Sequence, residues 1–243
     1  MKMMSALTII AGDFHLPNQD SLLVRKWIEF ISVNQPNLVI INGDLLDMWE
    51  LSKFDKVPKS GEGIEKEFEL GKLFFQTLRK YYHGRVVLVE GNHDFRIKTF
   101  LISVAPQLYG IHGLCVEDQL ELDRWNVEYI QSPSDASKWQ DCYIEVEDIY
   151  VGHFNLCRAD SGATAKALVN KYGVSIIQNH VHRYGVFQKK LINGKYLTGV
   201  ENFCMCDLNP GYMRNANWNQ GFSVIRSGQI IPIPYSSGNF IHL

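Results

Sequence analysis

Three features are missing from this chain, and each absence excludes a class of protein. No uninterrupted apolar run approaches the ~18 residues of a membrane-spanning helix, so no membrane span is expected. A broad nucleic-acid-binding surface is usually basic, whereas here 24 Lys and Arg residues face 26 Asp and Glu residues. The net charge of −2 still leaves room for a local basic groove. No secretory signal opens the chain, because a short apolar stretch reaches Asp13 at once, and a cytoplasmic protein is expected.

Cysteine is scarce, and its spacing indicates no disulfide framework. The five cysteines are odd in number and form no Cys-x-x-Cys pair. Cys204 and Cys206 alternate in a strand-like stretch, which points both thiols to one face. We expect the cysteines to be small buried hydrophobic residues in a reducing compartment.

The remaining composition is that of a globular domain. Of the 243 residues, 46% are hydrophobic and 21% are charged, which is ordinary for a chain that buries a sizeable core. The sequence contains no internal repeat, low-complexity tract or linker. A single domain spanning residues 1–243 is therefore expected.

Five apolar runs each end in Asp, Asn or His side chains. In chain order these polar residues are Asp13 and His15, Asp44 and Asp47, Asn92 and His93, His153, and His180 and His182. Read as buried strands, the preceding runs deliver the polar side chains to their carboxyl ends, where open α/β sheets bind ligands. His83, His112 and His242 lie outside this pattern, and we expect them to be structural residues and not metal ligands.

The hydrophobic periodicity predicts a four-layer α-β-β-α sandwich, in which two mixed β-sheets are flanked by helices. Helices are expected over 20–32 with Asp20 or Ser21 as N-cap, 62–82, 94–104, and 163–172 with Ser161 as cap. The first three strands alternate with helices, which favours parallel pairing and right-handed crossovers. Further strands are expected over 127–130, an antiparallel pair within 141–151, 175–178, 185–191, 195–200, 221–226 and 229–233. Apart from the strand over 127–130, residues 107–140 remain unassigned.

The polar strand ends together predict a metal site, although each motif alone has a bland alternative such as a turn. In Asp13-x-His15 and His180-x-His182, side chains two residues apart lie on the same face of an extended segment. Carboxylate, imidazole and amide donors suit borderline divalent metals. Manganese is the expected metal, with iron, zinc or nickel as alternatives. Seven donors exceed the needs of one ion and suit two ions that share a carboxylate, the usual arrangement for phosphoester hydrolysis.

The order of these motifs over residues 13–182 resembles that of the calcineurin-like metallophosphoesterases. The resemblance implies the same four-layer fold and two metal positions. Its ligands would be Asp13, His15 and His182 at the first position, Asn92, His153 and His180 at the second, and Asp44 between them. It also implies that His93 is the catalytic histidine, that Asp47 orients it, and that a metal-bridging hydroxide attacks phosphorus in line. Asp94 is expected to fix its loop.

Two positions depart from the family pattern. Met48 follows Asp47 where protein phosphatases usually have Arg, which weakens a Ser/Thr phosphatase interpretation. Asn179 replaces the usual Gly before His180, and we expect Asn to tolerate a left-handed backbone there. Asn92 and Arg158 are the candidate substrate-binding residues. Arg96, Arg158 and Arg183 all flank the motifs and could bind a substrate phosphate, and surface charge is the alternative for each of them.

The substrate stays open among three alternatives. Leu51-Ser52-Lys53-Phe54-Asp55 and the aromatic, amide-rich stretch 211–222 resemble phage and prophage members of the superfamily, relatives of bacterial DNA-repair nucleases. This favours a phosphodiesterase acting on DNA, RNA or a nucleotide. A phosphomonoesterase is second, and a non-catalytic scaffold is third. The loop over 48–63 either covers substrate or is a solvated connector, and a homodimer remains open because repair-nuclease relatives dimerise.

Overall fold

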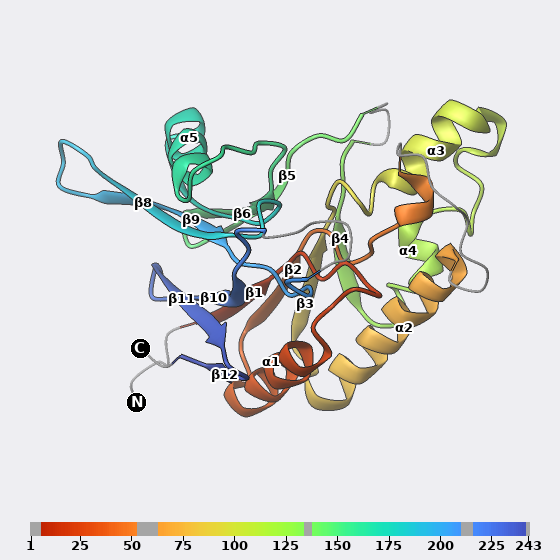
Figure 1. The fold of residues 1–243 in the computed structure, drawn as a ribbon, viewed down its shortest axis with the longest axis horizontal. Helices are drawn as coiled ribbons and strands as arrows, with labels where there is room; N and C mark the ends of the chain where they lie inside the picture. Colours follow the sequence, from red (N-terminus) through yellow and green to blue (C-terminus); the bar gives the residue numbers. More distant parts are fainter. Residues whose placement is uncertain (1–5, 53–62, 134–137, 210–215, 242–243) are drawn as a thin grey trace.

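The computed structural model describes residues 6–52, 63–133, 138–209 and 216–241 (Figure 1). The first β-sheet has seven strands in the order β12-β11-β10-β1-β2-β3-β4. Its strands are β1 (Leu7–Ala11), β2 (Leu38–Asn42), β3 (Arg85–Val89), β4 (Val127–Ile130), β10 (Gln220–Arg226), β11 (Gln229–Ser236) and β12 (Asn239–Phe240). Strands β1 to β4 are parallel neighbours, whereas β10 joins β1 antiparallel. The predicted parallel half is confirmed.

The second sheet has five strands in the order β5-β6-β7-β9-β8. These strands are β5 (Cys142–Val146), β6 (Ile149–His153), β7 (Ser175–Gln178), β8 (Tyr184–Lys190) and β9 (Tyr196–Asn202). The antiparallel β5–β6 hairpin turns at Glu147 and Asp148, as predicted, and both turn residues have positive φ. β6, β7 and β9 are parallel, so both sheets are mixed.

The apolar residues form three clusters that separate four layers. On β1, Ile9 and Ala11 pack toward helices α1 and α2, whereas Ile10 points to the second sheet, because successive side chains of a strand face opposite ways. The middle cluster lies between the two sheets. For example, it contains both Ile40 of β2 and Val151 of β6. A third cluster packs α5 on the outer face of the second sheet. The predicted α-β-β-α sandwich is confirmed.

Two long helices cover the first sheet. They are α1 (Ser21–Asn34) and α2 (Ile64–Tyr81), which contact each other (Figure 1). Asp20 is the N-cap of α1, because its Oδ1 accepts hydrogen bonds of 3.0 Å from the N–H groups of Leu22 and Leu23. Residues 53–62, which include most of the loop expected to cover substrate, lie outside the described residues, as do residues 211–215 of the aromatic stretch.

Smaller elements differ from expectation for local reasons. Helix α3 (Arg96–Val104) begins two residues later than predicted, because the Asp94 carboxylate accepts N–H groups of the preceding loop. Helix α5 (Ala163–Tyr172) begins after Gly162, whose φ is +79°, and not after a Ser161 cap. Within the previously unassigned stretch lie η2 (Pro106–Leu108) and α4 (Val116–Gln119), and η1 (Trp49–Leu51) follows the second metal motif. Among the described helices, none has the length and apolar character to cross a bilayer.

Candidate metal centre

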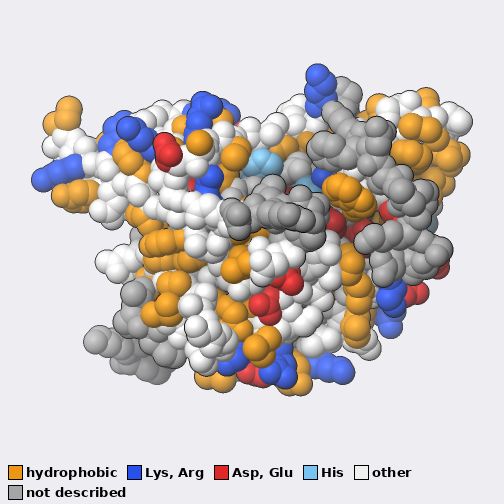
Figure 2. Space-filling view, in the orientation of Figure 1, with side chains coloured by type: hydrophobic (Ala, Val, Ile, Leu, Met, Phe, Trp, Pro, Cys, Tyr) orange, Lys and Arg blue, Asp and Glu red, His pale blue; other side chains and the backbone are white. Residues whose placement is uncertain are grey.

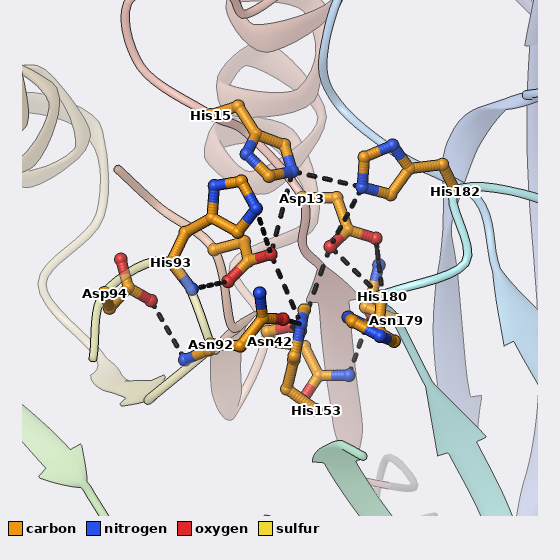
Figure 3. Close-up of polar contacts among 12 residues, drawn as sticks. Asp13, His15, Asn42, Asn92, His93, Asp94, His153, Asn179, His180 and His182 are labelled. Atoms are coloured by element: carbon orange, nitrogen blue, oxygen red, sulfur yellow. Dashed lines mark hydrogen bonds and ion pairs between the residues drawn. The ribbon is translucent and has the colours of Figure 1, made fainter. Parts of the chain in front are cut away.

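The polar strand ends from both sheets meet at one place (Figure 3). Strands β1, β2 and β3 supply Asp13, His15, Asp44, Asn92 and His93 from the first sheet, and β6 and β7 supply His153, His180 and His182 from the second. The sheets bring these side chains together because the carboxyl ends of β1, β2, β3, β6 and β7 point to a common edge. Every residue predicted as a metal ligand therefore lies in one cluster.

The first group of donors consists of Asp13, His15 and His182. The Nε2 atoms of His15 and His182 are 3.0 Å apart, and His182 Nε2 is 3.6 Å from Asp13 Oδ1. Asp13 and His15 are almost fully buried, so these donors face each other with little access to water. Two ring nitrogens this close need a proton or a shared cation between them.

The second group consists of Asp44, His153 and His180, with Asn92 beside it. His153 Nε2 lies 3.4 Å from Asp44 Oδ2 and 3.2 Å from Asn92 Oδ1. The same Asp44 oxygen is 3.7 Å from His15 Nε2 in the first group. Asp44 Oδ2 thus faces both groups, which is the arrangement that a shared carboxylate ligand requires.

The electrostatics of this cluster fit divalent cations. Asp13, Asp44 and Asp47 place three carboxylates in an almost water-free cluster, where unpaired negative charge is costly. Burial alone would lower the pKa of His15, but Asp47, Asp44 and Asp13 raise it to about 10. His15 Nδ1 is buried and faces Asp47 Oδ1 at 3.4 Å. Oxygen and imidazole donors within 4.8 Å of one another suit borderline divalent metals.

Left-handed backbone conformations aim several of these side chains. Asp13, His15 and Asp44 have φ values between 49° and 54°, and His180 and His182 also have positive φ. Non-glycine residues adopt this region at a cost and persist there when the surroundings hold them. The Asp13 N–H donates to Gly43 O at 3.0 Å and the His15 N–H donates to Asp44 O at 3.0 Å. Neighbouring strand ends therefore hold the strained residues.

Glycines allow the chain to pass close to these ligands. A Cβ on Gly91 would lie 2.2 Å from the backbone nitrogen of Asp44, and one on Gly43 would lie 2.3 Å from His153 Nδ1. Real side-chain carbons do not approach other atoms so closely. Gly91 is therefore required where the segment after β3 passes Asp44, and Gly43 is required where the segment after β2 passes His153 of β6.

The comparisons agree with this geometry. Residues 7–184 match the family model described as calcineurin-like phosphoesterase. The chain belongs to the calcineurin-like phosphoesterase family. The protein is accordingly a metal-dependent hydrolase, and the family resemblance found in the sequence is confirmed.

Two phage proteins are among the relatives of this phosphoesterase. The Gene 54 protein of Mycobacterium phage L5 is 28% identical over 254 residues and covers 98% of this chain and 96% of its own. The Gene 54 protein of Mycobacterium phage D29 is 26% identical, with 91% of this chain and 89% of its own covered. Vps29 from Entamoeba histolytica, solved in complex with Zn²⁺, aligns with 97% of this chain and 96% of its own at 13% identity and a TM-score of 0.49.

His93 lies beside the metal donors and is held on both sides of its ring. Its Nδ1 is 3.1 Å from Asp47 Oδ1 and 2.9 Å from Asp47 O. Its Nε2 is 2.9 Å from the Arg96 guanidinium, which also donates to Asp47 O at 2.8 Å. Since Arg96 can only donate, His93 Nε2 is an acceptor in this arrangement and the ring is neutral. Burial also lowers the pKa of His93, which favours the neutral ring.

The phosphoesterase thus brings Arg96, and not Arg158, into contact with the site. The Arg158 side chain is exposed, and its backbone N–H donates to Thr164 Oγ1 at 3.0 Å. Arg96 sits on the first turn of α3, three residues after His93, where helical spacing brings the two side chains together. This three-residue spacing is visible in the sequence, and it could have indicated that Arg96 contacts His93. The Arg96 guanidinium also lies 3.5 Å from the Met48 carbonyl. Helix α3 therefore places a guanidinium beside the position where protein phosphatases usually have Arg.

A buried amide network behind the donors was missed in the sequence. Asn179 Oδ1 accepts hydrogen bonds from Asn42 Nδ2 at 2.8 Å and Asn202 Nδ2 at 3.0 Å, and its Nδ2 donates to Asp13 Oδ2 at 3.2 Å. The expectation of a left-handed backbone at Asn179 was wrong, because the positive φ falls on His180. Asn179 fixes the Asp13 carboxylate instead, as an outer-shell partner of a proposed ligand.

Three cysteines are buried as expected, and two of them lie behind His182. Cys142, Cys204 and Cys206 are buried, whereas Cys157 is exposed and Cys115 is intermediate. Cys206 Sγ is 3.9 Å from His182 Nδ1. Burial raises the pKa of the Cys204 thiol, which keeps it protonated at neutral pH.

Glu67 beneath the site should make the stability of this phosphoesterase depend on pH. The carboxylate accepts the Met48 N–H at 2.5 Å, and burial raises its pKa from 4.5 to about 7. The folded protein therefore binds a proton that the unfolded chain releases between these values, so its stability falls as pH rises through this window. Glu67→Gln removes the titration and should gain about 3 kcal/mol over the wild type between pH 4.5 and pH 8.

Urea unfolding at a series of pH values measures this difference. The exposed Glu65 on the first turn of the same helix supplies the control, as Glu65→Gln should give a curve parallel to that of the wild type. A parallel curve for Glu67→Gln as well would mean that Glu67 does not titrate in this range.

Proposed function

We propose that this phosphoesterase is a phosphodiesterase that cleaves a nucleic acid or a nucleotide, and that it acts in the cytoplasm. The observation that carries the proposal is a basic face over α5 and β8, which leads away from the metal centre along β8. Lys166 on α5 and Lys189 and Lys190 on β8 are exposed and have no carboxylate at ion-pair distance among the described residues. Figure 2 shows Lys and Arg side chains gathered over α5 and β8, next to the hollow in which histidine atoms are visible.

This face stands out because the whole chain carries a net charge of −2. Lysines outside the metal cluster can contact phosphates that flank the scissile one, and a small phosphomonoester has no such phosphates. A polyanion would also be drawn to this side of the molecule by its field. The charge distribution therefore supports a polynucleotide or oligonucleotide substrate over a small monoester.

The proposed ligands are those that the family pattern assigns. Asp13, His15 and His182 would hold one ion, Asn92, His153 and His180 would hold the other, and the Asp44 carboxylate would be shared by the two positions. When bound, two divalent cations, for which we propose Mn²⁺, would make hydroxide available at neutral pH and would neutralise charge on the phosphate oxygens. Asn179 and Asp47 orient the donors around this position.

The other residues act on the leaving group and on the phosphate. Asp47 accepts the Nδ1 proton of His93, so that Nε2 is directed to the departing ester oxygen. The Arg96 guanidinium, now at His93 Nε2, would move to a non-bridging phosphate oxygen when substrate binds. Once Arg96 has moved, His93 Nε2 takes up a proton from water, which the nearby Asp44 and Asp47 carboxylates favour. The protonated ring then stabilises the transition state or gives that proton to the leaving oxygen.

Chelator treatment followed by Mn²⁺ gives the direct test. We expect activity to vanish with chelator, to return with Mn²⁺, and to favour bis-p-nitrophenyl phosphate over p-nitrophenyl phosphate. Hydrolysis of an oligonucleotide should weaken as salt rises, because lysine–phosphate contacts release counterions. A preference for the monoester would make the enzyme a phosphomonoesterase. Inactivity on both compounds with two ions bound would make it a scaffold.

A further inference from the structure

Two tryptophans lie against the histidines of the metal centre, and neither belongs to the family motifs. Trp139 precedes β5, and its ring centroid is 5.6 Å from that of His153 and 6.4 Å from that of His180. Trp218 precedes β10, with its centroid 4.4 Å from that of His182. One tryptophan therefore accompanies each group of metal donors.

Both rings are partly exposed and are held in place. The Trp139 indole N–H donates to Glu90 O at 3.4 Å, and its plane lies 30° from that of His180. Next to Trp218, Asn219 donates its N–H to His182 O at 2.9 Å, and its Oδ1 accepts the Tyr184 N–H at 3.0 Å. These contacts tie the two aromatic side chains to the segments that carry the donors.

We propose that Trp139 and Trp218 stack on the bases on either side of the scissile phosphate, and that the substrate is single-stranded nucleic acid. This inference rests on the proposed phosphodiesterase function. A diester held at the two metal positions has a nucleoside on each side, and each nucleoside meets one tryptophan. Only an unpaired base can offer its ring face to an indole, and such stacking contributes ~1–3 kcal/mol per base without sequence preference.

A structural role for the tryptophans predicts something different. If they only pack on the imidazoles and exclude water, their loss would impair every diester equally. If they bind bases, their loss would weaken the binding of a substrate with bases and spare a substrate without them. The two roles therefore separate when a base-bearing and a base-free substrate of the same length are compared.

The experiment measures KM and kcat of the Mn²⁺-loaded enzyme on oligo-dT and on an oligonucleotide of equal length in which abasic tetrahydrofuran residues replace the nucleosides. Trp139→Ala and Trp218→Ala should each raise KM for oligo-dT about 5- to 100-fold and leave KM for the abasic strand within about twofold. Trp139→Phe and Trp218→Phe should recover most of the loss, because phenylalanine keeps a stacking face. A duplex of the same length should be a poor substrate.

Trp125 supplies the matched control, because it is partly exposed and stacks with Arg124 on another part of the molecule. Trp125→Phe should change neither KM. Equal losses on the oligo-dT and abasic strands would overturn the stacking role, as would an unchanged KM for oligo-dT in both alanine variants. A wild type that cleaves bis-p-nitrophenyl phosphate but not oligo-dT would reject the stacking inference alone. A metal-loaded wild type that cleaves neither would reject the phosphodiesterase function with it.

Discussion

Replacing His93 with alanine should lower kcat about 10²- to 10⁴-fold for a diester with an alkoxide leaving group and should leave the binding of two metal ions intact. The loss follows from the position of His93 Nε2 at the edge of the donor cluster and from the Asp47 hydrogen bond of 3.1 Å that orients the ring. His93 Nε2 is 4.0 Å from Asp44 Oδ2, the nearest metal donor to which it forms an ion-pair contact. Metal analysis of the purified variant separates catalysis from metal binding.

The leaving group shows which step His93 serves. An alkoxide needs a proton as it departs, whereas p-nitrophenolate leaves readily without one. His93→Ala should therefore impair a dinucleotide far more than bis-p-nitrophenyl phosphate. His83→Ala, at an exposed histidine outside the cluster, should leave both rates unchanged. A His93→Ala variant that retains near-normal turnover of the dinucleotide would overturn the assignment, and one that loses a metal ion would make His93 a ligand.

Replacing Asp44 with asparagine should lower kcat/KM about 10³-fold and reduce the bound metal below two ions per chain. One oxygen of Asp44 faces His153 at 3.4 Å and His15 at 3.7 Å, so the carboxylate supplies negative charge to both positions. A bound cation lowers the barrier by several kcal/mol through charge neutralisation, and the loss of an ion forfeits that contribution. Calorimetric titration of the chelator-treated protein with Mn²⁺ measures the stoichiometry.

Asp44 also has a structural contact that the asparagine retains in part. Its Oδ1 accepts the His93 N–H at 2.8 Å, and an amide oxygen can accept the same bond. Loss of activity with an intact fold is therefore expected, and near-ultraviolet circular dichroism should be unchanged. Asp123→Asn, at an exposed carboxylate, is the control for the change from Asp to Asn. Two ions bound to Asp44→Asn with wild-type affinity would contradict a shared ligand at this position.

The sandwich could be predicted because its central strands are buried on both faces and are therefore apolar along their whole length. Val86 and Leu88 pack toward the helices while Val87 and Val89 pack toward the second sheet, so the third strand is a continuous apolar run in the sequence. The ends of such runs are equally visible when polar residues follow directly. The strand ends that carry Asp13, Asp44 and His93 could therefore be found without a structure.

The supporting contacts could not be found in the same way, because they join residues far apart in the chain. Asn42 and Asn179 are 137 positions apart, and nothing in either neighbourhood indicates that their amides meet. Trp218 follows the last family motif by more than thirty residues and reaches His182 through tertiary contacts, such as the hydrogen bond from the Asn219 N–H to His182 O, that its neighbourhood in the sequence does not indicate. Local competition explains the shifted start of α3, where the Asp94 carboxylate accepts the Gly91 N–H. A hydrogen bond of this kind, made by one side chain, shifts the first residue of a helix without changing the periodicity of its apolar residues.

The division of the metal centre between two sheets has a consequence for the order of folding. Asp13 and His182, the first and last of these donors, are 169 positions apart in the sequence and lie 3.6 Å apart in the folded chain. Contacts between such distant positions form late, because the intervening chain must be ordered before they are gained. A chain emerging from a ribosome can form β1 to β4 and their helices early, yet it cannot complete either group of donors until His180 and His182, which follow β7, have emerged. Metal capture should thus be among the last events of biosynthesis.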